Sequence, residues 1–269
     1  MNTPTPVTWL FCPANRPDRY AKAFAASDAV IIDLEDAVDP PDKDAARAML
    51  SRELGGLDPE RTVVRINPPG TADHRADLEL LTGSPLTTIM LPKAAAAEDI
   101  HDLAPYRVIA LCETVGGILA AEAIAAAPGC VAITWGAQDL AVEMGAASTR
   151  DDGGRFLPFA EHARSMVRFA AAAAGIPAIE TVWVEIADHA GLAEESRRAT
   201  DEGFRGKLVI HPAHVSVVRN AFRSSDEQLR WAEGVLAASH GEGAAAVGGQ
   251  MIDRPIIELA RALVARASR

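Results

Sequence analysis

The 269-residue chain is poor in aromatic side chains, in cysteine and in positive charge, and each shortage excludes a class of protein. Its 26 lysines and arginines face 37 aspartates and glutamates, so a formal net charge of -11 argues against nucleic acid or an anionic membrane as the main partner. Cys12, Cys112 and Cys130 show no C-x-x-C spacing and lie in or beside apolar runs. They are therefore predicted to be reduced core residues of a cytoplasmic protein.

Long apolar runs are also missing. The first run, "VTWLFCP" at Val7–Pro13, is too short for a membrane span or for the hydrophobic region of a signal peptide, and no basic segment precedes it. We therefore expect no membrane association.

What the sequence does contain is a series of eight short apolar runs with helix-like segments between them. Continuously apolar strands are typical of parallel sheets covered on both faces, so eight strand–helix units predict a closed (β/α)8 barrel of the TIM type. The alternative is an open doubly wound sheet, but no G-x-G-x-x-G follows the first run. The runs are Val7–Pro13, Ala29–Glu35, Thr62–Pro68, Thr87–Lys93, Arg107–Thr114, Cys130–Ala137, Ile179–Val184 and Lys207–Pro212.

The end of the chain departs from this alternation. We predict a barrel over residues 1–222 and a C-terminal helical extension over residues 223–269. Within the extension, Ser225–His240 is expected to be one helix and the glycine-rich segment Gly241–Gln250 a flexible hinge. A last helix begins near "MIDRPIIEL". A hinge followed by an amphipathic helix is typical of a lid or of an element exchanged between subunits.

Charged residues gather at the C-terminal ends of the predicted strands, where the active sites of such barrels lie. Each has a structural interpretation as well. Asp33, Asp36 or Asp139 could cap a helix, Arg65 could form an ion pair, and Lys93 could be a loop charge. Their recurrence at the same end of successive strands favours a functional site. The residues are Asp33, Glu35, Asp36, Arg65, Asn67, Lys93, Glu113, Asp139 and His211.

Two of these acids suit a magnesium ion. Glu113 closes one apolar run and Asp139 follows the next. Mg²⁺ prefers oxygen ligands, usually takes one or two protein carboxylates, and completes its shell with water and substrate oxygens. Zinc is a poorer candidate, because the sequence has no histidine pair or cysteine set at ligand spacing. Such a metal, with Arg65 nearby, would bind a 2-oxo acid and stabilise an enolate as a carbon–carbon bond forms or breaks.

A set of motifs that runs in order from Trp9 to about Pro255 resembles the citrate lyase beta-subunit-like (CitE-like) proteins of the HpcH/HpaI aldolase superfamily. The resemblance implies a TIM barrel, Mg²⁺, and an oxo-acid lyase or synthase that acts on 3-hydroxyacyl thioesters such as citryl-, citramalyl- or malyl-CoA. The 2-oxo acid would be oxaloacetate, pyruvate or glyoxylate, and the assembly a homotrimer or a multiple of it. The motifs are "WLFCPANRPDRYAKA", "AVIIDLEDAVDPPDKDAAR", "VVRIN", "IMLPKA", "ALCETVGGI", "AITWGAQDL", "KLVIHPAHV" and "GGQMIDRP".

The resemblance also implies roles for individual residues. Glu113 and Asp139 match the metal ligands, and Arg65 matches the arginine that binds the substrate carboxylate. Glu35 and Asp36 match acids beside the water shell of the metal. Arg65 and Glu113 are thus expected to be catalytic as well as substrate-binding.

Residues near the two ends of the chain match further family positions. Asp253 matches a C-terminal aspartate that reaches a neighbouring subunit's site in acyl-CoA lyase relatives, where it would act in acid–base catalysis. At the start of a predicted helix, the same residue could equally be a cap. Asn15, Arg16, Arg19 and Lys22 fall where relatives contact the CoA phosphates.

The chain departs from the family pattern beside the metal ligands. Where the family usually has "LPKVE", this chain has Ala94 and Ala95 after the lysine and lacks the glutamate. Gly116 replaces the arginine of the usual "ETARG", and Gln138 replaces the glutamate of the usual "GAED". Changes around a metal site commonly lower affinity or activity ~10–100-fold. These changes suggest one alternative, a non-catalytic homologue that binds a 2-oxo acid or CoA. The sequence also leaves open the beta component of a multi-subunit citrate lyase. A class II aldolase ranks lower, because it would need a histidine base near the metal and none follows the first two strands.

Overall fold

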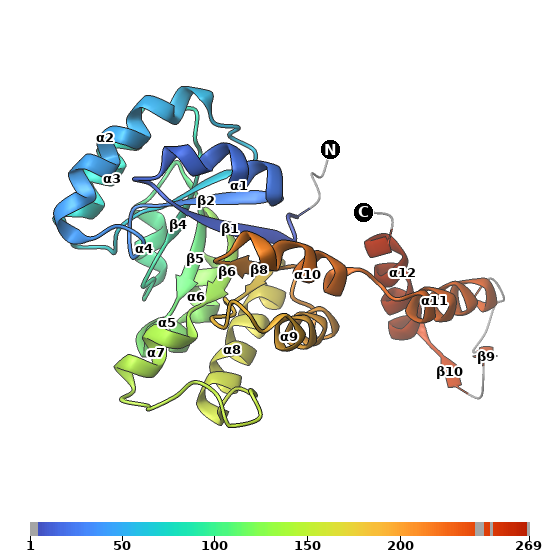
Figure 1. Ribbon diagram of the computed structural model, residues 1–269. Coiled ribbons are helices and arrows are strands. Elements are labelled where there is room, and N and C mark those ends of the chain that lie inside the picture. The colour runs from blue at the N-terminus through green and yellow to red at the C-terminus, as the bar shows by residue number, and fades with distance from the viewer. Residues whose placement is uncertain (1–4, 240–244, 248–249, 268–269) are drawn as a thin grey trace.

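Eight parallel strands close into a barrel in which each strand pairs with its neighbours in the sequence and β8 returns to β1 (Figure 1). The computed structural model describes residues 5–239, 245–247 and 250–267. The predicted TIM barrel is confirmed. The strands are β1 Thr8–Pro13, β2 Ala29–Asp33, β3 Thr62–Arg65, β4 Thr88–Leu91, β5 Arg107–Cys112, β6 Cys130–Trp135, β7 Ala178–Glu180 and β8 Gly206–Val209.

Most predicted runs continue past the observed strand ends. Leu34 after β2 and Ile66 after β3 are fully buried although they lie outside the strands. Apolar burial thus extends into the loops above the barrel, and a sequence pattern based on burial cannot separate these residues from the strand itself.

Side chains of the strands alternate between two apolar cores. In β5, Ile109 and Leu111 point into the barrel, where they meet residues such as Ile31. Val108 and Ala110 belong to the second core, between the sheet and the surrounding helices. Glu113 is the first residue after β5 and lies two positions after Leu111. The alternation therefore directs Glu113 toward the inside of the barrel as well.

Helices surround the barrel, and many of their ends follow from local sequence. The longest, α8, begins with Pro158, whose missing N–H is not needed at a first turn, and ends at Gly175 with a left-handed φ of 70°. Within the described residues, no helix is long and apolar enough to span a membrane. The helices are α1 Tyr20–Ala26, α2 Lys43–Glu53, α3 Ala72–Leu81, α4 Ala97–His101, α5 Val115–Leu119, α6 Ala121–Ala126, α7 Ala137–Glu143, α8 Pro158–Ala174, α9 His189–Asp201 and α10 Pro212–Phe222, with short 3-10 turns at Pro17–Arg19, Pro40–Asp42 and Leu54–Gly56.

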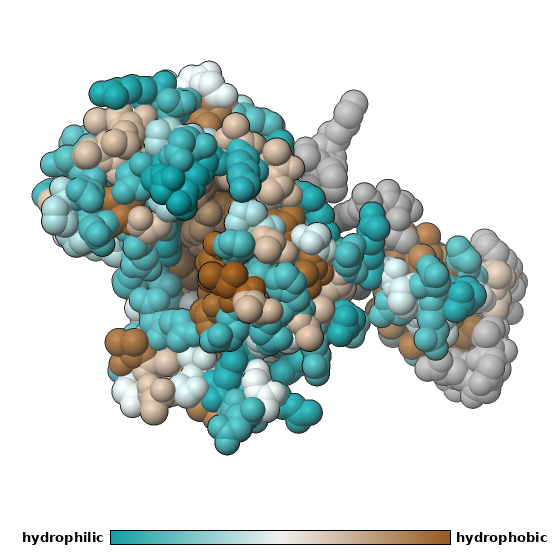
Figure 2. All heavy atoms as spheres, viewed as in Figure 1, coloured by the Kyte–Doolittle hydropathy of each residue, from teal (hydrophilic) through white to brown (hydrophobic). Residues whose placement is uncertain are grey.

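The C-terminal extension stands away from the barrel in both overall views (Figures 1 and 2). Helix α11 (Asp226–Ala238) begins with a capping box in which Ser225 and Gln228 exchange hydrogen bonds. It packs on α12 (Arg254–Ala267) around a small separate core. The buried residues of this core are Ala232, Val235, Ile252, Ala260 and Leu263.

The segment predicted as a flexible hinge contains short strands instead. Ala245–Val247 forms β9 and pairs antiparallel with β10, Gln250–Ile252. The rest of the predicted hinge, residues 241–244 and 248–249, lies outside the described residues. In the described part of this segment, backbone pairing forms regular structure despite the high glycine content. The mobility of the hinge stays a prediction.

Candidate active site

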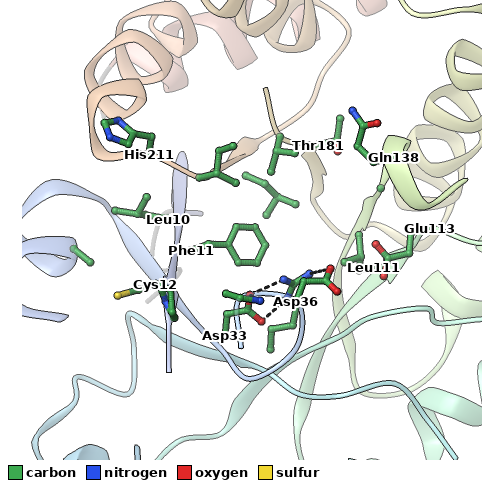
Figure 3. A pocket seen from close by; sticks show the side chains of 18 of the residues that line it. Leu10, Phe11, Cys12, Asp33, Asp36, Leu111, Glu113, Gln138, Thr181 and His211 are labelled. Atoms are coloured by element: carbon green, nitrogen blue, oxygen red, sulfur yellow. Dashed lines mark hydrogen bonds and ion pairs between the residues drawn. The ribbon is translucent and has the colours of Figure 1, made fainter. Parts of the chain in front are cut away.

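The site lies where the inward-facing residues of the strands change from apolar to charged. Ile31 is followed two residues later by Asp33, Val63 by Arg65, and Leu111 by Glu113. All three charged residues are buried. They line a cavity of about 760 Å³ at the C-terminal ends of the strands (Figure 3).

Arg65 is held by Asp33, its partner in the register of β2 and β3. Arg65 Nε and Nη2 donate to the two Asp33 oxygens at 2.7 and 2.6 Å, and the guanidinium lies 4.7 Å from the centre of the Phe11 ring. Asp33 also accepts hydrogen bonds from the backbone N–H groups of Glu35 and Ala37. It stabilises the loop after β2 and does not cap a helix.

This pairing confirms the interpretation that Arg65 forms an ion pair. The edge of Arg65 formed by Nε and Nη2 already binds Asp33, so the full fork is not available to a substrate. Sequence reasoning missed Asp33 as the partner, although an acid and a base at matching positions of neighbouring strands were a usable signal.

The other guanidinium nitrogen of Arg65 faces two more acids. Nη1 lies 2.9 Å from Glu35 Oε2 and 3.5 Å from Asp36 Oδ2. The short contact lacks hydrogen-bond alignment, and Glu35 Oε2 is buried without a hydrogen-bond partner. Burial raises the pKa of Glu35 above its ordinary value, although Arg65 and Lys93 act in the opposite direction. Asp36 is exposed and caps no described helix.

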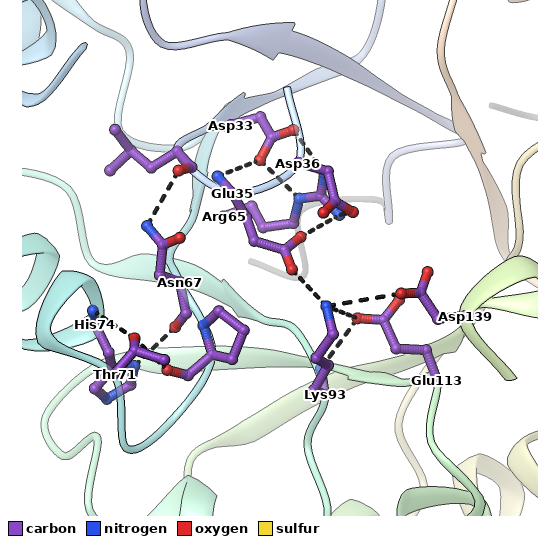
Figure 4. Close-up of polar contacts among 12 residues, drawn as sticks. Asp33, Glu35, Asp36, Arg65, Asn67, Thr71, His74, Lys93, Glu113 and Asp139 are labelled. Atoms are coloured by element: carbon purple, nitrogen blue, oxygen red, sulfur yellow. Dashed lines mark hydrogen bonds and ion pairs between the residues drawn. The ribbon is translucent and has the colours of Figure 1, made fainter. Parts of the chain in front are cut away.

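Lys93 lies among three carboxylates (Figure 4). Its Nζ is 2.7 Å from Glu35 Oε1, 3.9 Å from Glu113 Oε1 and 3.7 Å from Asp139 Oδ1. The interpretation as a simple loop charge is therefore wrong. Burial lowers the pKa of Lys93, but the hydrogen bond to Glu35 and the charges of Glu113 and Asp139 outweigh it and leave the pKa raised. An ammonium of this kind is not a Schiff-base nucleophile, which agrees with the sequence interpretation.

Glu113 is a buried acid that faces other acids. Burial raises its pKa to about 8, with further contributions from Asp139 and Glu35. At neutral pH such a group holds a proton or needs a cation. Asp139, from the first turn of α7, makes no side-chain cap there, so its interpretation as a helix cap is wrong.

Gly136 provides the space that Glu113 occupies. A Cβ added at this glycine would lie 2.6 Å from Glu113 Oε2 and 2.7 Å from Glu113 Cβ. Sequence reasoning missed this role, since nothing in the pattern around "WGAQ" tells which side chain the glycine faces.

The acids fit a magnesium ion. Glu113 follows β5, Asp139 follows the adjacent β6, and both approach the same ammonium, so their oxygens face a common space that already holds a positive charge. Within the described chain, no group of three or more His, Cys, Asp or Glu residues is placed to hold a metal. Two carboxylates with open positions for water and substrate are what Mg²⁺ usually takes, whereas a closed zinc cage would need more protein ligands.

The remaining predicted residues are only partly brought together. Arg19 and Lys22 line the cavity. Asn15 and Arg16 are not among its lining residues, and Arg16 forms a hydrogen-bonded ion pair with Asp18. The opposite wall includes His211, which the sequence placed at a strand end without a role, and Thr181, which sequence reasoning missed.

Asp253 directly precedes α12, a helix that lies beside α11 and away from the barrel (Figure 1), and it is not among the residues that line the cavity. Its Oδ1 accepts a hydrogen bond from the Ile256 N–H at 3.2 Å, so the residue acts as a helix cap. A role at the cavity of the same chain is therefore not supported.

The three residues that depart from the family pattern lie in different places relative to the cavity. Gln138 lines the cavity, whereas Gly116 and Ala95 are exposed and are not among the lining residues. Of the three, Gln138 is thus the one in a position to alter contacts with a ligand.

Comparison with known proteins gives the family. The family model described as HpcH/HpaI aldolase/citrate lyase matches residues 8–212. A citrate lyase subunit beta-like protein of Mycobacterium tuberculosis is 50% identical over 260 residues, which cover 96% of this chain and 94% of that protein. The chain belongs to this family. The resemblance noted from the motifs is confirmed.

Two further family relatives carry information on ligands and reactions. The crystal structure of CitE from M. tuberculosis in complex with magnesium, acetoacetate and coenzyme A matches with a TM-score of 0.95 and 48% identity, and it covers 100% of both chains. The mitochondrial citramalyl-CoA lyase of Homo sapiens is 30% identical over 292 residues, 96% of this chain and 84% of that protein.

Proposed function

We propose that this protein is a Mg²⁺-dependent carbon–carbon lyase or synthase that acts on a 3-hydroxyacyl-CoA of the citryl, citramalyl or malyl type. It would release or use a 2-oxo acid such as oxaloacetate, pyruvate or glyoxylate. The observation that carries the proposal is Glu113, a buried acid at the cavity that shares one ammonium with the partly exposed Asp139 and whose burial no short ion pair compensates. The magnesium and coenzyme A bound by the M. tuberculosis relative support the same chemistry.

Glu113 and Asp139 would hold the metal, and Glu35 and Asp36 would face its water shell. When bound, Mg²⁺ would supply Lewis-acid stabilisation of the negative charge that develops on the 2-oxo acid oxygens. The fit rests on the hard oxygen donors of Glu113 and Asp139, on the cavity that both residues line, and on Glu35 Oε2, a buried oxygen beside them that has no hydrogen-bond partner.

Arg65 would orient the 2-oxo acid. Because Asp33 fixes the guanidinium on one side and Phe11 lies against its face, the positive charge is in place before a substrate arrives. A preorganised charge of this kind stabilises an anion without the cost of ordering a flexible side chain. Arg65 would act through Nη1, which Asp33 does not contact and which faces Glu35 and Asp36.

The thioester would lie toward the basic side of the cavity. Arg19 and Lys22 line this side and would contact the CoA phosphates, with Asn15 and Arg16 next to them. The protein would work as a homotrimer or a multiple of it, and Asp253 would act in acid–base catalysis over a neighbouring subunit's site. The three cysteines are free and buried, which supports a reducing compartment, the cytoplasm.

A thioester panel tests the proposal. Citryl-, citramalyl- and malyl-CoA are incubated with the protein in Mg²⁺ or in EDTA, and both products are quantified by chromatography. We expect Mg²⁺-dependent release of a 2-oxo acid and an acyl-CoA in equal amounts, lost in Glu113→Gln and Asp139→Asn and retained in the exposed control Asp18→Asn.

The other outcomes identify the alternatives. Cleavage only of a thioester on an acyl-carrier protein would indicate a citrate lyase beta component. Release of free CoA without a 2-oxo acid would indicate hydrolysis. Ligand binding with no turnover of any thioester would indicate a non-catalytic homologue.

A further inference from the structure

Lys93 contacts the acidic residues at the cavity, although it is not among the lining residues, and the proposed function gives it no task. Its ammonium has a hydrogen bond to Glu35 at 2.7 Å and only longer Coulombic contacts, 3.7 and 3.9 Å, to Asp139 and Glu113. The last two are the proposed magnesium ligands. The single lysine therefore faces both ligands while it is anchored to a third acid.

We propose that Lys93 is a built-in counter-ion that neutralises Glu113 and Asp139 in the metal-free protein and competes with Mg²⁺ for them. The proposal rests on the magnesium site of the proposed function and adds what controls its affinity. Lys93 is thus a positioning residue that stabilises the empty site and weakens metal binding.

The two cations cannot neutralise the same oxygens at short range, because like charges repel and the repulsion is strong where water is partly excluded. Lys93 can give way without losing its anchor. Its contacts to Glu113 and Asp139 are not hydrogen bonds, whereas the bond to Glu35 is. The side chain is 34% exposed, so it has space toward solvent. Metal entry therefore requires a small displacement of the ammonium and no broken hydrogen bond.

The main chain of Lys93 has a separate task. Its φ of 53° lies in the left-handed region, which is uncommon for a residue with a side chain, and its N–H donates to Glu113 Oε1 at 3.1 Å. This hydrogen bond fixes the carboxylate and does not involve the ammonium. Substitutions with other non-glycine side chains therefore keep the backbone contact and test the charge alone.

The test measures Mg²⁺ affinity by titration calorimetry and thermal unfolding in EDTA, for wild type, Lys93→Met and Lys93→Arg. Measurements are made at about pH 9, above the pKa of about 8 of Glu113, so that protons do not replace the lost lysine. Arg107→Met is the matched control, because it removes one positive charge from the exposed, opposite end of β5.

We expect Lys93→Met to bind Mg²⁺ at least about tenfold more tightly and its metal-free form to unfold at a lower temperature. Lys93→Arg and Arg107→Met should stay close to wild type in affinity. If Lys93→Met does not fold, Lys93→Gln provides the same comparison.

Two results would overturn the proposal in different ways. If wild type binds Mg²⁺ and Lys93→Met binds it equally well or more weakly, the counter-ion role is rejected. The proposed function is not affected by that result. Wild type that binds no Mg²⁺, with or without a 2-oxo acid, would reject the metal site and the counter-ion role together.

Discussion

At the scale of single residues, the site is a set of buried charges whose positions are fixed by packing. Arg65 is held between Asp33 and the Phe11 ring, and Glu113 is held by the Lys93 N–H. Each contact joins side chains or backbone from different strands or loops. The result is a cavity whose polar groups are in place before a ligand binds, which is the arrangement that electrostatic catalysis needs.

Gly136 offers a prediction on how tightly Glu113 is placed. Gly136→Ala should lower Mg²⁺ affinity by about tenfold or more, because the new Cβ overlaps Glu113 and displaces its carboxylate. Calorimetric titration with Mg²⁺ measures the effect. Gly116→Ala is the control, since a Cβ there meets nothing within 4 Å. Equal affinities in the two variants would show that Glu113 can shift without loss.

Glu113 also predicts a pH dependence of stability in the absence of metal. Burial raises its pKa from the ordinary 4.5 to about 8, so between these values the folded protein keeps a proton that the unfolded chain has released. Stability is therefore lost as the pH rises through this range. Urea unfolding in EDTA measures the free energy of unfolding at the two ends of this pH range. Between them, wild type should lose on the order of 3–5 kcal/mol more of this free energy than Glu113→Gln. Parallel curves for the two proteins would contradict the raised pKa.

At the scale of elements, the chain combines a barrel with a helical pair that has its own small core. The barrel carries the cavity, and the C-terminal pair α11 and α12 stands apart (Figure 1). Since no described residue of α12 lines the cavity of its own chain, a catalytic role for this helix requires a second subunit.

Asp253 allows the cap and the catalytic role to be separated. Asp253→Ala removes both the cap and the carboxylate, whereas Asp253→Asn keeps a capping oxygen and removes the acid. If the acid is catalytic, both variants should lose thioester turnover while Mg²⁺ and 2-oxo acid still bind. If Asp253 is only a cap, Asp253→Asn should keep full turnover, and Asp253→Ala should lose about 1 kcal/mol of stability. Steady-state kinetics and urea unfolding decide between these results.

At the scale of the whole molecule, the proposed function needs two chains to complete one site. A mixture of Asp253→Ala and Glu113→Gln subunits should regain activity, because some sites would combine an intact Glu113 with an intact Asp253 from the neighbour. Turnover is measured before and after subunit exchange, which is followed by mass spectrometry of the assemblies. Exchange without any regained activity would mean that Asp253 does not act across subunits.

The eight strands and the magnesium candidates could be predicted from local patterns. Each of these features can be recognised within a short stretch of sequence, because burial and backbone preference act locally. This holds for the apolar runs, for the helical segments between them and for the acids at the ends of the runs. Glu113 and Asp139 were therefore identifiable one by one. The two helices of the extension followed in the same way from Ser225 and from the apolar spacing after residue 253.

The pairing of the charged residues was decided only by the tertiary structure. Closure of the barrel and the register of β2 with β3 bring Arg65 to Asp33, and the left-handed backbone of Lys93 brings its N–H and its ammonium to the same side. Gly136 lies against Glu113, and Asp253 is not among the lining residues of the cavity, because of how segments distant in the sequence are arranged in space. Such contacts depend on distances between strands, loops and helices, and no periodicity within one stretch of sequence encodes them.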